Sequence, residues 1–262
     1  MSGLDRLDLR ILIGAGSFSD AAAALQIVEG LPRPLFSGLG GLFIEEPDVF
    51  TTCQMPHQQI VSPSGIRTLA PKVSEIKLLL RADARAFERA VLRAAQTVGA
   101  GCAFAEEQGD LIATSLRAAK GWDVLLIGYR RVHPKRGKVV VIKNARPLDE
   151  TIDTVSSSLS HTFSTERIVL SVAPQAETAK AAQINPSLLF DSVGDCARAL
   201  ARINCLVVLL DLAQGPVSNT PDFSRILDAA RCPIMAFGAQ KQASTDEISS
   251  TAQSHLSGLR KS

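Results

Sequence analysis

The feature that most constrains this chain is a helix-strand unit that occurs twice. The first copy, Cys102 to Tyr129, reads CAFAEEQGDLIATSLRAAKGWDVLLIGY: a short strand, a Gly-Asp turn, an amphipathic helix and a buried strand. In the second, more divergent copy, Val193-Gly194-Asp195 opens CARALARI, and the apolar run from Cys205 to Asp211 follows. Two copies of one unit indicate a duplicated α/β domain.

Strands and helices are expected to alternate along the whole chain. Leu9 to Ala15 is a continuous apolar run, typical of a strand buried on both faces of a parallel sheet. The alanine-rich segment after it predicts a helix, capped by Ser19 or Asp20. This alternation predicts parallel sheets with helical crossovers. Further strands are expected around Leu42–Ile44 and at Val139–Lys143, Arg167–Val172, Cys205–Asp211 and Cys232–Phe237, and helices at Lys72–Val98, Asp149–Phe163 and Pro186–Ile203.

Two tandem units are the economical organisation, with residues 1–136 in the first, 137–240 in the second and a polar tail at 241–262. The chain passes through Gly137-Lys138 directly into VVVIK, so the first unit lacks its last helix and has little room for its last strand. Whether Val139–Lys143 finishes the first sheet or begins the second stays open. Residues 47–71 are interpreted as an insertion covering the carboxyl edge of the sheet.

Charge and cysteine spacing exclude several classes of function. A net charge of +2 gives no case for bulk nucleic-acid binding. The five cysteines never have C-x-x-C spacing, and the four histidines lie far apart, so we expect reduced thiols and no metal site. Acids precede the first apolar run, and no run approaches the roughly 18 residues that span a bilayer. We expect a soluble, cytoplasmic protein without a membrane partner.

Four segments resemble the universal stress protein family, in particular its tandem bacterial members. They are ILIGAGSFSDAAAAL, GLFIEEP, EEQGDLIATSLRAAKGWDVLLIG and ILDAARCPIMAFG. The resemblance implies Rossmann-like units, each with a five-stranded parallel sheet of order 3-2-1-4-5. It also implies that many relatives bind ATP at the carboxyl ends of the strands, whereas others act through protein contacts. Helix N-termini lining such an edge make it a suitable place for a ligand.

The residues at the family's ATP site are degraded in both units. Ala15 stands where ATP binders carry an aspartate, and Asn144 takes that place in the second unit. Of the family's phosphate-binding glycines, Gly128 fits the first, but Arg131 occupies the second position and Asp211 replaces the first glycine of the second unit. A retained site would use Ala15, Gly16, Ser17, Ile44, Gly128, Arg130 and Arg131.

Other chemistry has little support in the sequence. The basic residues from Arg130 to Lys138 could hold an anion by charge alone, but a solvated linker is the favoured interpretation. The Gly14-x-Gly16 pair lacks the rest of a dinucleotide fingerprint, and neither a P-loop nor a nucleophile elbow is present. We therefore expect no catalytic residue.

The favoured function is a non-enzymatic stress-response protein that acts through protein contacts or an altered small ligand, without a cofactor. The first alternative is an ATP-binding, slowly hydrolysing member that uses Mg-ATP, and the second is a purely structural subunit. A homodimer is expected, because a first unit without its last strand would leave an unpaired edge that invites a partner.

Overall fold

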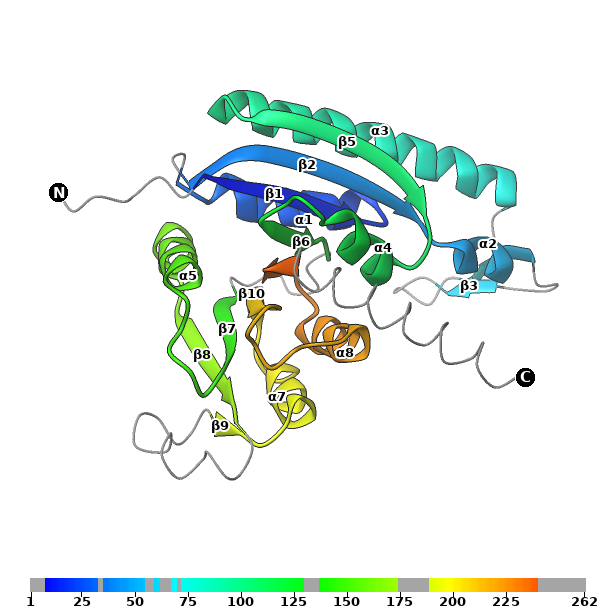
Figure 1. The fold of residues 1–262 in the computed structure, drawn as a ribbon. Helices are drawn as coiled ribbons and strands as arrows, with labels where there is room; N and C mark the ends of the chain where they lie inside the picture. The colour runs from blue at the N-terminus through cyan, green and yellow to red at the C-terminus, as the bar shows by residue number, and fades with distance from the viewer. Residues whose placement is uncertain are drawn as a thin grey trace, which may run out of the picture.

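The fold is built on one nine-stranded sheet, seen in a computed structural model that describes residues 8–32, 35–54, 59–61, 67–69, 72–129, 137–173 and 189–239 (Figure 1). The strand order is β5-β2-β1-β6-β11-β10-β7-β8-β9, and β3 and β4 form a separate hairpin. The strands are β1 (Leu9–Ala15), β2 (Phe36–Glu45), β3 (Gln59–Val61), β4 (Arg67–Leu69), β5 (Gly101–Gln108), β6 (Val124–Ile127), β7 (Lys138–Asn144), β8 (Arg167–Val172), β9 (Leu189–Phe190), β10 (Cys205–Asp211) and β11 (Ile234–Phe237). The helices are α1 (Phe18–Glu29), α2 (Pro47–Gln54), α3 (Val73–Val98), α4 (Leu111–Ala118), α5 (Glu150–Thr162), α7 (Val193–Leu200) and α8 (Thr220–Ala230).

The strand order confirms the predicted α/β architecture. In the second half, β9-β8-β7-β10-β11 are parallel neighbours in the order 3-2-1-4-5. The first half has β5-β2-β1-β6, which is 3-2-1-4 with no fifth strand among its described residues. Only residues 128–137 separate β6 from β7, so Val139–Lys143 belongs to the second half. The domain boundary at Arg136 and the tail at 241–262 lie outside the described residues and stay predictions.

The two halves join in one sheet where β11 pairs with β6. This pair is antiparallel, with Met235 opposite Leu126 and Ala236 opposite Leu125. The last strand of the second half therefore takes the place of the strand that the first half lacks. Because this edge is paired within the chain, it offers no unpaired strand to a second copy, and the homodimer itself stays a prediction.

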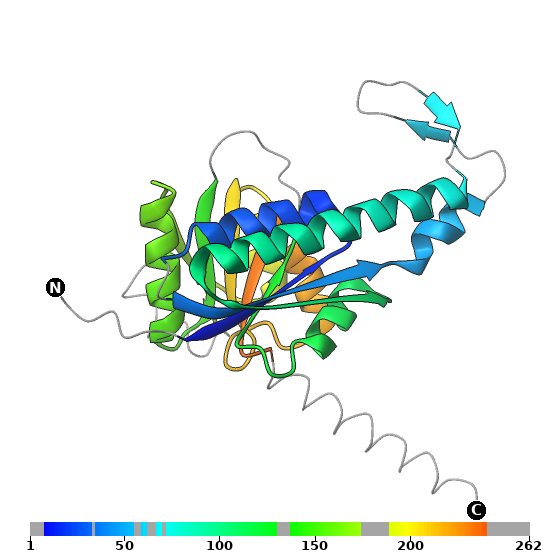
Figure 2. The same cartoon turned by 90° about the horizontal axis from the view of Figure 1, so that it is seen from above.

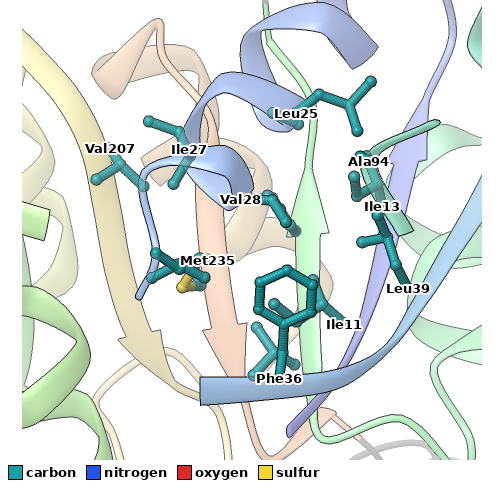
Figure 3. Packing of buried hydrophobic residues seen from close by; sticks show 14 of the residues in the cluster. Ile11, Ile13, Leu25, Ile27, Val28, Phe36, Leu39, Ala94, Val207 and Met235 are labelled. Carbon is teal, nitrogen blue, oxygen red and sulfur yellow. The ribbon is translucent and has the colours of Figure 1, made fainter. Parts of the chain in front are cut away.

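The core lies on both faces of the sheet, and the two halves share it. Buried residues of α1, α3 and α5 form one cluster against the sheet, and those of α4, α7 and α8 form the other. Figure 3 shows Ile27 of α1 among Val207 of β10 and Met235 of β11, so a helix of the first half covers strands of the second. Burying each such side chain stabilises the fold by about 1.5–3 kcal/mol.

Two predicted helix starts differ from the structure. The N-cap of α1 is Ser17, not Ser19 or Asp20, because the Ser17 Oγ accepts the Asp20 N–H at 3.2 Å. The helix expected at Pro186–Ile203 is shorter, since β9 comes first and Ser192 caps α7. Because Ser192 caps α7, Gly194-Asp195 of the second copy lies inside the helix. In the first copy, by contrast, Asp110 of Gly109-Asp110 is the cap of α4.

Other boundaries and packing roles follow the sequence closely. The last strand begins at Ile234, two residues later than expected, because Pro233 offers no N–H to a strand ladder. The ring of Trp122 packs where a side chain on Gly40 would stand. The longest helix of the described chain is α3, and Gly99 ends it with a φ of 70°, a conformation that glycine adopts without strain.

Candidate functional site

The expected nucleotide edge lies where the carboxyl ends of β1, β2 and β6 meet. Ala15 and Ile44 are both fully buried there and offer apolar side chains. Gly16 begins the turn into α1, and a Cβ on it would meet the Ile44 carbonyl at an ordinary 3.6 Å. The structure therefore brings Ala15, Gly16 and Ile44 together, as the resemblance implied, but no polar side chain among them replaces the aspartate of ATP binders.

Gly128 is enclosed by the first turn of α1. Its N–H donates to the Gly14 carbonyl at 2.8 Å, which continues the β1–β6 ladder. A Cβ on Gly128 would lie 2.7 Å from the Asp20 carbonyl oxygen and 3.2 Å from the Ala15 side chain. The absence of a side chain at Gly128 thus lets α1 pack closely against the end of β6. The backbone of α1 occupies the space beside the glycine.

The N-terminus of α1 is occupied by carboxylates of the chain itself. The Phe18 N–H donates to Oδ2 of Asp83 on α3 at 3.0 Å. The Ser17 Oγ donates to the Asp20 carboxylate and accepts the Asp20 N–H. Helix N-termini commonly bind phosphate through such donors. Here the N–H groups of Phe18 and Asp20 are already bonded, and Asp20 and Asp83 would repel a phosphate group.

The basic loop is only partly described. Arg130 and Arg131 lie outside the described residues. Lys138, at the end of the loop, begins β7 and pairs with Glu166 at 2.7 Å, with both side chains well exposed. An exposed pair of this kind contributes little stability, and it leaves Lys138 less available to an anion.

The equivalent edge of the second half is nearly closed. Asn144 ends β7, and its Nδ2 donates across to the Gln214 carbonyl of the loop after β10. Asp211 turns that loop, because its Oδ1 accepts the N–H groups of Ala213 at 2.8 Å and Gln214 at 3.0 Å. The hollow that remains measures about 90 Å³, well below the roughly 300–1,000 Å³ of ligand pockets.

Lys143 lies at the rim of this small hollow. Its Nζ donates to the Arg146 carbonyl at 2.7 Å, and partial burial lowers the pKa of the Lys143 ammonium. The Arg146 N–H in turn donates to Asn144 Oδ1 at 2.9 Å. These bonds hold the loop after β7 in place and commit its polar groups to one another.

A larger hollow, which the sequence did not predict, lies at the outer carboxyl end of the first half. It measures about 360 Å³. The Lys77 ammonium lies 5.7 Å from the centre of the Phe50 ring, and Gln108 donates to Glu45 at 3.3 Å. The signal that could have revealed it is the pair Lys77 and Arg81, one turn apart on α3. The hollow is lined by Glu45, Pro47, Phe50, Val73, Lys77, Arg81 and Gln108.

Metal and thiol chemistry find no support in the described part of the chain. No group of three or more potential metal-ligating side chains occurs there. Cys196, Cys205 and Cys232 are buried and reduced, and desolvation raises the pKa of Cys196 to about 12. Cys102 is exposed; partial burial and the nearby Glu88 carboxylate raise its pKa. Within the described residues, no helix combines the length and the apolar character that crossing a bilayer requires.

Comparison with known proteins finds similarity at the level of structure. No protein-family model and no curated protein matches the sequence. Among solved structures, the chain is similar to a universal stress protein from Archaeoglobus fulgidus, with 7% identity, a TM-score of 0.46, and coverage of 87% of this chain and 95% of that one. It is also similar to a protein from Pseudomonas aeruginosa described as a universal stress protein, with 11% identity, a TM-score of 0.45, and coverage of 94% and 99%. The fold assignment itself rests on the 3-2-1-4-5 strand order of this chain.

Proposed function

We propose that this protein is a cytoplasmic stress-response protein that acts through protein contacts, without catalysis and without a bound nucleotide. The observation that carries the proposal is the closed N-terminus of α1. Asp83 accepts the Phe18 N–H, and the backbone of Asp20 lies against Gly128, at the position where the resemblance places a phosphate. A nucleotide would have to displace both contacts and approach two carboxylates.

The hollow beside Phe50 supports a second candidate function, the binding of an altered small ligand. Its volume of about 360 Å³ lies within the range of small-molecule pockets. Lys77 and Arg81 supply positive charges, and Glu45 supplies a negatively charged hydrogen-bond acceptor. A small molecule that carries both a carboxylate and a hydrogen-bond donor suits this lining.

A thermal melt with and without Mg-ATP tests the main proposal. A ligand at 100 times its Kd stabilises a folded protein by about 2.7 kcal/mol, which raises the Tm of a chain of this size by several degrees. We expect no rise with Mg-ATP. A rise of several degrees, or a nucleotide released from freshly purified protein on denaturation and found by mass spectrometry, would refute the nucleotide-free function.

A further inference from the structure

The outer surface of α3 carries a row of cations at a strict four-residue spacing. All five side chains are exposed. Residues four apart on a helix are about 6 Å apart along its axis, so the row extends over about 24 Å. Figure 1 and Figure 2 show α3 lying along the outside of the sheet, next to β5 at the open end of the strand order. We name this row the basic ridge; it consists of Lys77, Arg81, Arg85, Arg89 and Arg93.

The described part of the chain does not neutralise the basic ridge. Among the described residues, no carboxylate forms an ion pair with any of its five members. Two acids of α3 are used elsewhere: Glu75 accepts the Lys72 N–H at 3.0 Å, and Asp83 accepts the Phe18 N–H. Glu88 is the remaining acid on this helix. Like charges four residues apart destabilise a helix, so the row opposes the stability of the element that carries it.

Large apolar side chains border the basic ridge. Leu78 is 70% exposed and lies three residues before Arg81; Leu92 is 44% exposed and lies three residues after Arg89. Residues three apart are neighbours on a helix surface. Leu79, also on α3, is 63% exposed. The exposed face of α3 therefore combines guanidinium groups with leucines, the composition of a protein-binding surface in which arginine is enriched.

We propose that the exposed face of α3 binds an acidic, helical segment of a partner protein, with carboxylates at four-residue spacing and apolar side chains between them. This inference rests on the proposed function through protein contacts. Guanidinium groups form bidentate pairs with carboxylates, and the four-residue rows of two helices pack into each other's grooves. The exposed leucines supply the apolar part of the contact.

The other polyanions fit this face less well. An interfacial helix inserts its apolar face into a membrane, but the apolar face of α3 (Ala84, Phe87, Val91 and Ala95) is buried against the sheet. A nucleic acid is disfavoured by the net charge of +2 and by leucines where polar donors to phosphate would be expected.

The test uses the full chain and a labelled synthetic helical peptide with glutamate at every fourth position and leucine between, followed by fluorescence anisotropy. The ridge variant is Arg85→Glu with Arg89→Glu. The matched control is Arg202→Glu with Arg231→Glu, two exposed arginines outside α3 that lower the net charge equally. We expect the ridge variant to bind at least about tenfold more weakly, and the control to bind like the unmodified chain.

Three outcomes would overturn the proposal: no peptide binding by the unmodified chain, equal weakening in both variants, or tighter binding of phosphatidylserine vesicles or a DNA duplex than of the peptide. Circular dichroism of each variant establishes that it is folded. A rise in Tm with Mg-ATP would refute only the nucleotide-free function. It would not bear on the peptide site, because the peptide assay does not involve the N-terminus of α1. Loss of peptide binding without such a rise would refute only the partner assigned to α3.

Discussion

Two glycines at the expected nucleotide edge have different surroundings. A Cβ on Gly128 would stand 2.7 Å from the Asp20 carbonyl oxygen, whereas a Cβ on Gly16 would make only an ordinary contact at 3.6 Å. The atom that a Cβ on Gly128 would meet belongs to the backbone, so a side-chain rotation cannot relieve the clash. We therefore expect Gly128→Ala to destabilise the protein by about 1–3 kcal/mol, since extra atoms in a packed site force the backbone to shift.

Gly16→Ala is the matched control for this prediction. Its effect should stay within about 0.5 kcal/mol, as for substitutions that create no clash. Urea denaturation followed by circular dichroism measures both changes. Equal effects at the two positions would show that the space beside Gly128 is open, and would reopen the question of a ligand there.

At the scale of a helix end, α7 depends on a serine cap. Ser192 Oγ accepts the Asp195 N–H at 3.1 Å and donates to the Asp195 carboxylate at 2.7 Å. The bond from Ser192, and then the Arg198 guanidinium, lower the pKa of Asp195. A carboxylate whose pKa is lower in the folded state adds stability above its unfolded pKa, and this is lost as the pH falls through the folded value.

Ser192→Ala should therefore have two effects. Loss of the cap is expected to destabilise the fold by about 1 kcal/mol at neutral pH, and the pKa of Asp195 should rise. An NMR titration of the Asp195 carboxyl carbon measures the pKa, and thermal melts measure the stability. Ser192→Thr, which keeps a hydroxyl, serves as the control; an unchanged Asp195 pKa in Ser192→Ala would contradict the assigned cause.

The basic ridge of α3 makes a prediction about stability that is separate from binding. Arg85 lies between Arg81 and Arg89 and three residues before Glu88. Arg85→Glu therefore converts two repulsive four-residue pairs into attractive ones, and one attractive three-residue pair into a repulsive one. Each of these pairs contributes a few tenths of a kcal/mol, so we expect the free energy of unfolding to rise by about 0.5 kcal/mol. Arg85→Gln should give about half of that gain.

Chemical denaturation in low salt measures these gains, which should shrink in high salt as the charges are screened. A loss of stability in Arg85→Glu would mean that Arg85 makes a favourable contact within its own chain. A gain would show that the arginines lower the stability of the helix that carries them.

The sequence predicted elements well where one local pattern dominates. β1, β8 and β10 match their expected bounds residue for residue, because buried parallel strands are uninterrupted apolar runs. The helix α3 was equally clear from its length and period. The contact of Asp83 with Phe18 could not be predicted, since it joins residues 65 positions apart through tertiary packing. The same holds for the hollow beside Phe50, which needs two helices and two strand ends to exist.

At the scale of the whole molecule, the seam between β6 and β11 decides whether the halves behave as separate domains. Resemblance to a repeated unit predicted two sheets, and the pairing of β11 with β6 joins them into one. The local sequence cannot reveal this pairing. Both β6 and β11 are short apolar runs, and such a run is compatible with either sheet. The shared cluster around Ile27, Val207 and Met235 adds a common core. We infer that the described halves unfold together.

Met235→Ala tests this inference. Met235 is 1% exposed, pairs with Leu126 across the seam and lies in the cluster that α1 covers. Its truncation should destabilise the protein by about 2–5 kcal/mol, through lost burial and a cavity. If the seam couples the halves, the Tm should fall with one transition retained, and the calorimetric and van't Hoff enthalpies should agree.

Leu79→Ala, at an exposed position of α3, is the control and should change stability by no more than about 0.5 kcal/mol. Two resolved transitions, with only one displaced by Met235→Ala, would mean that the halves are independent domains in spite of their continuous sheet.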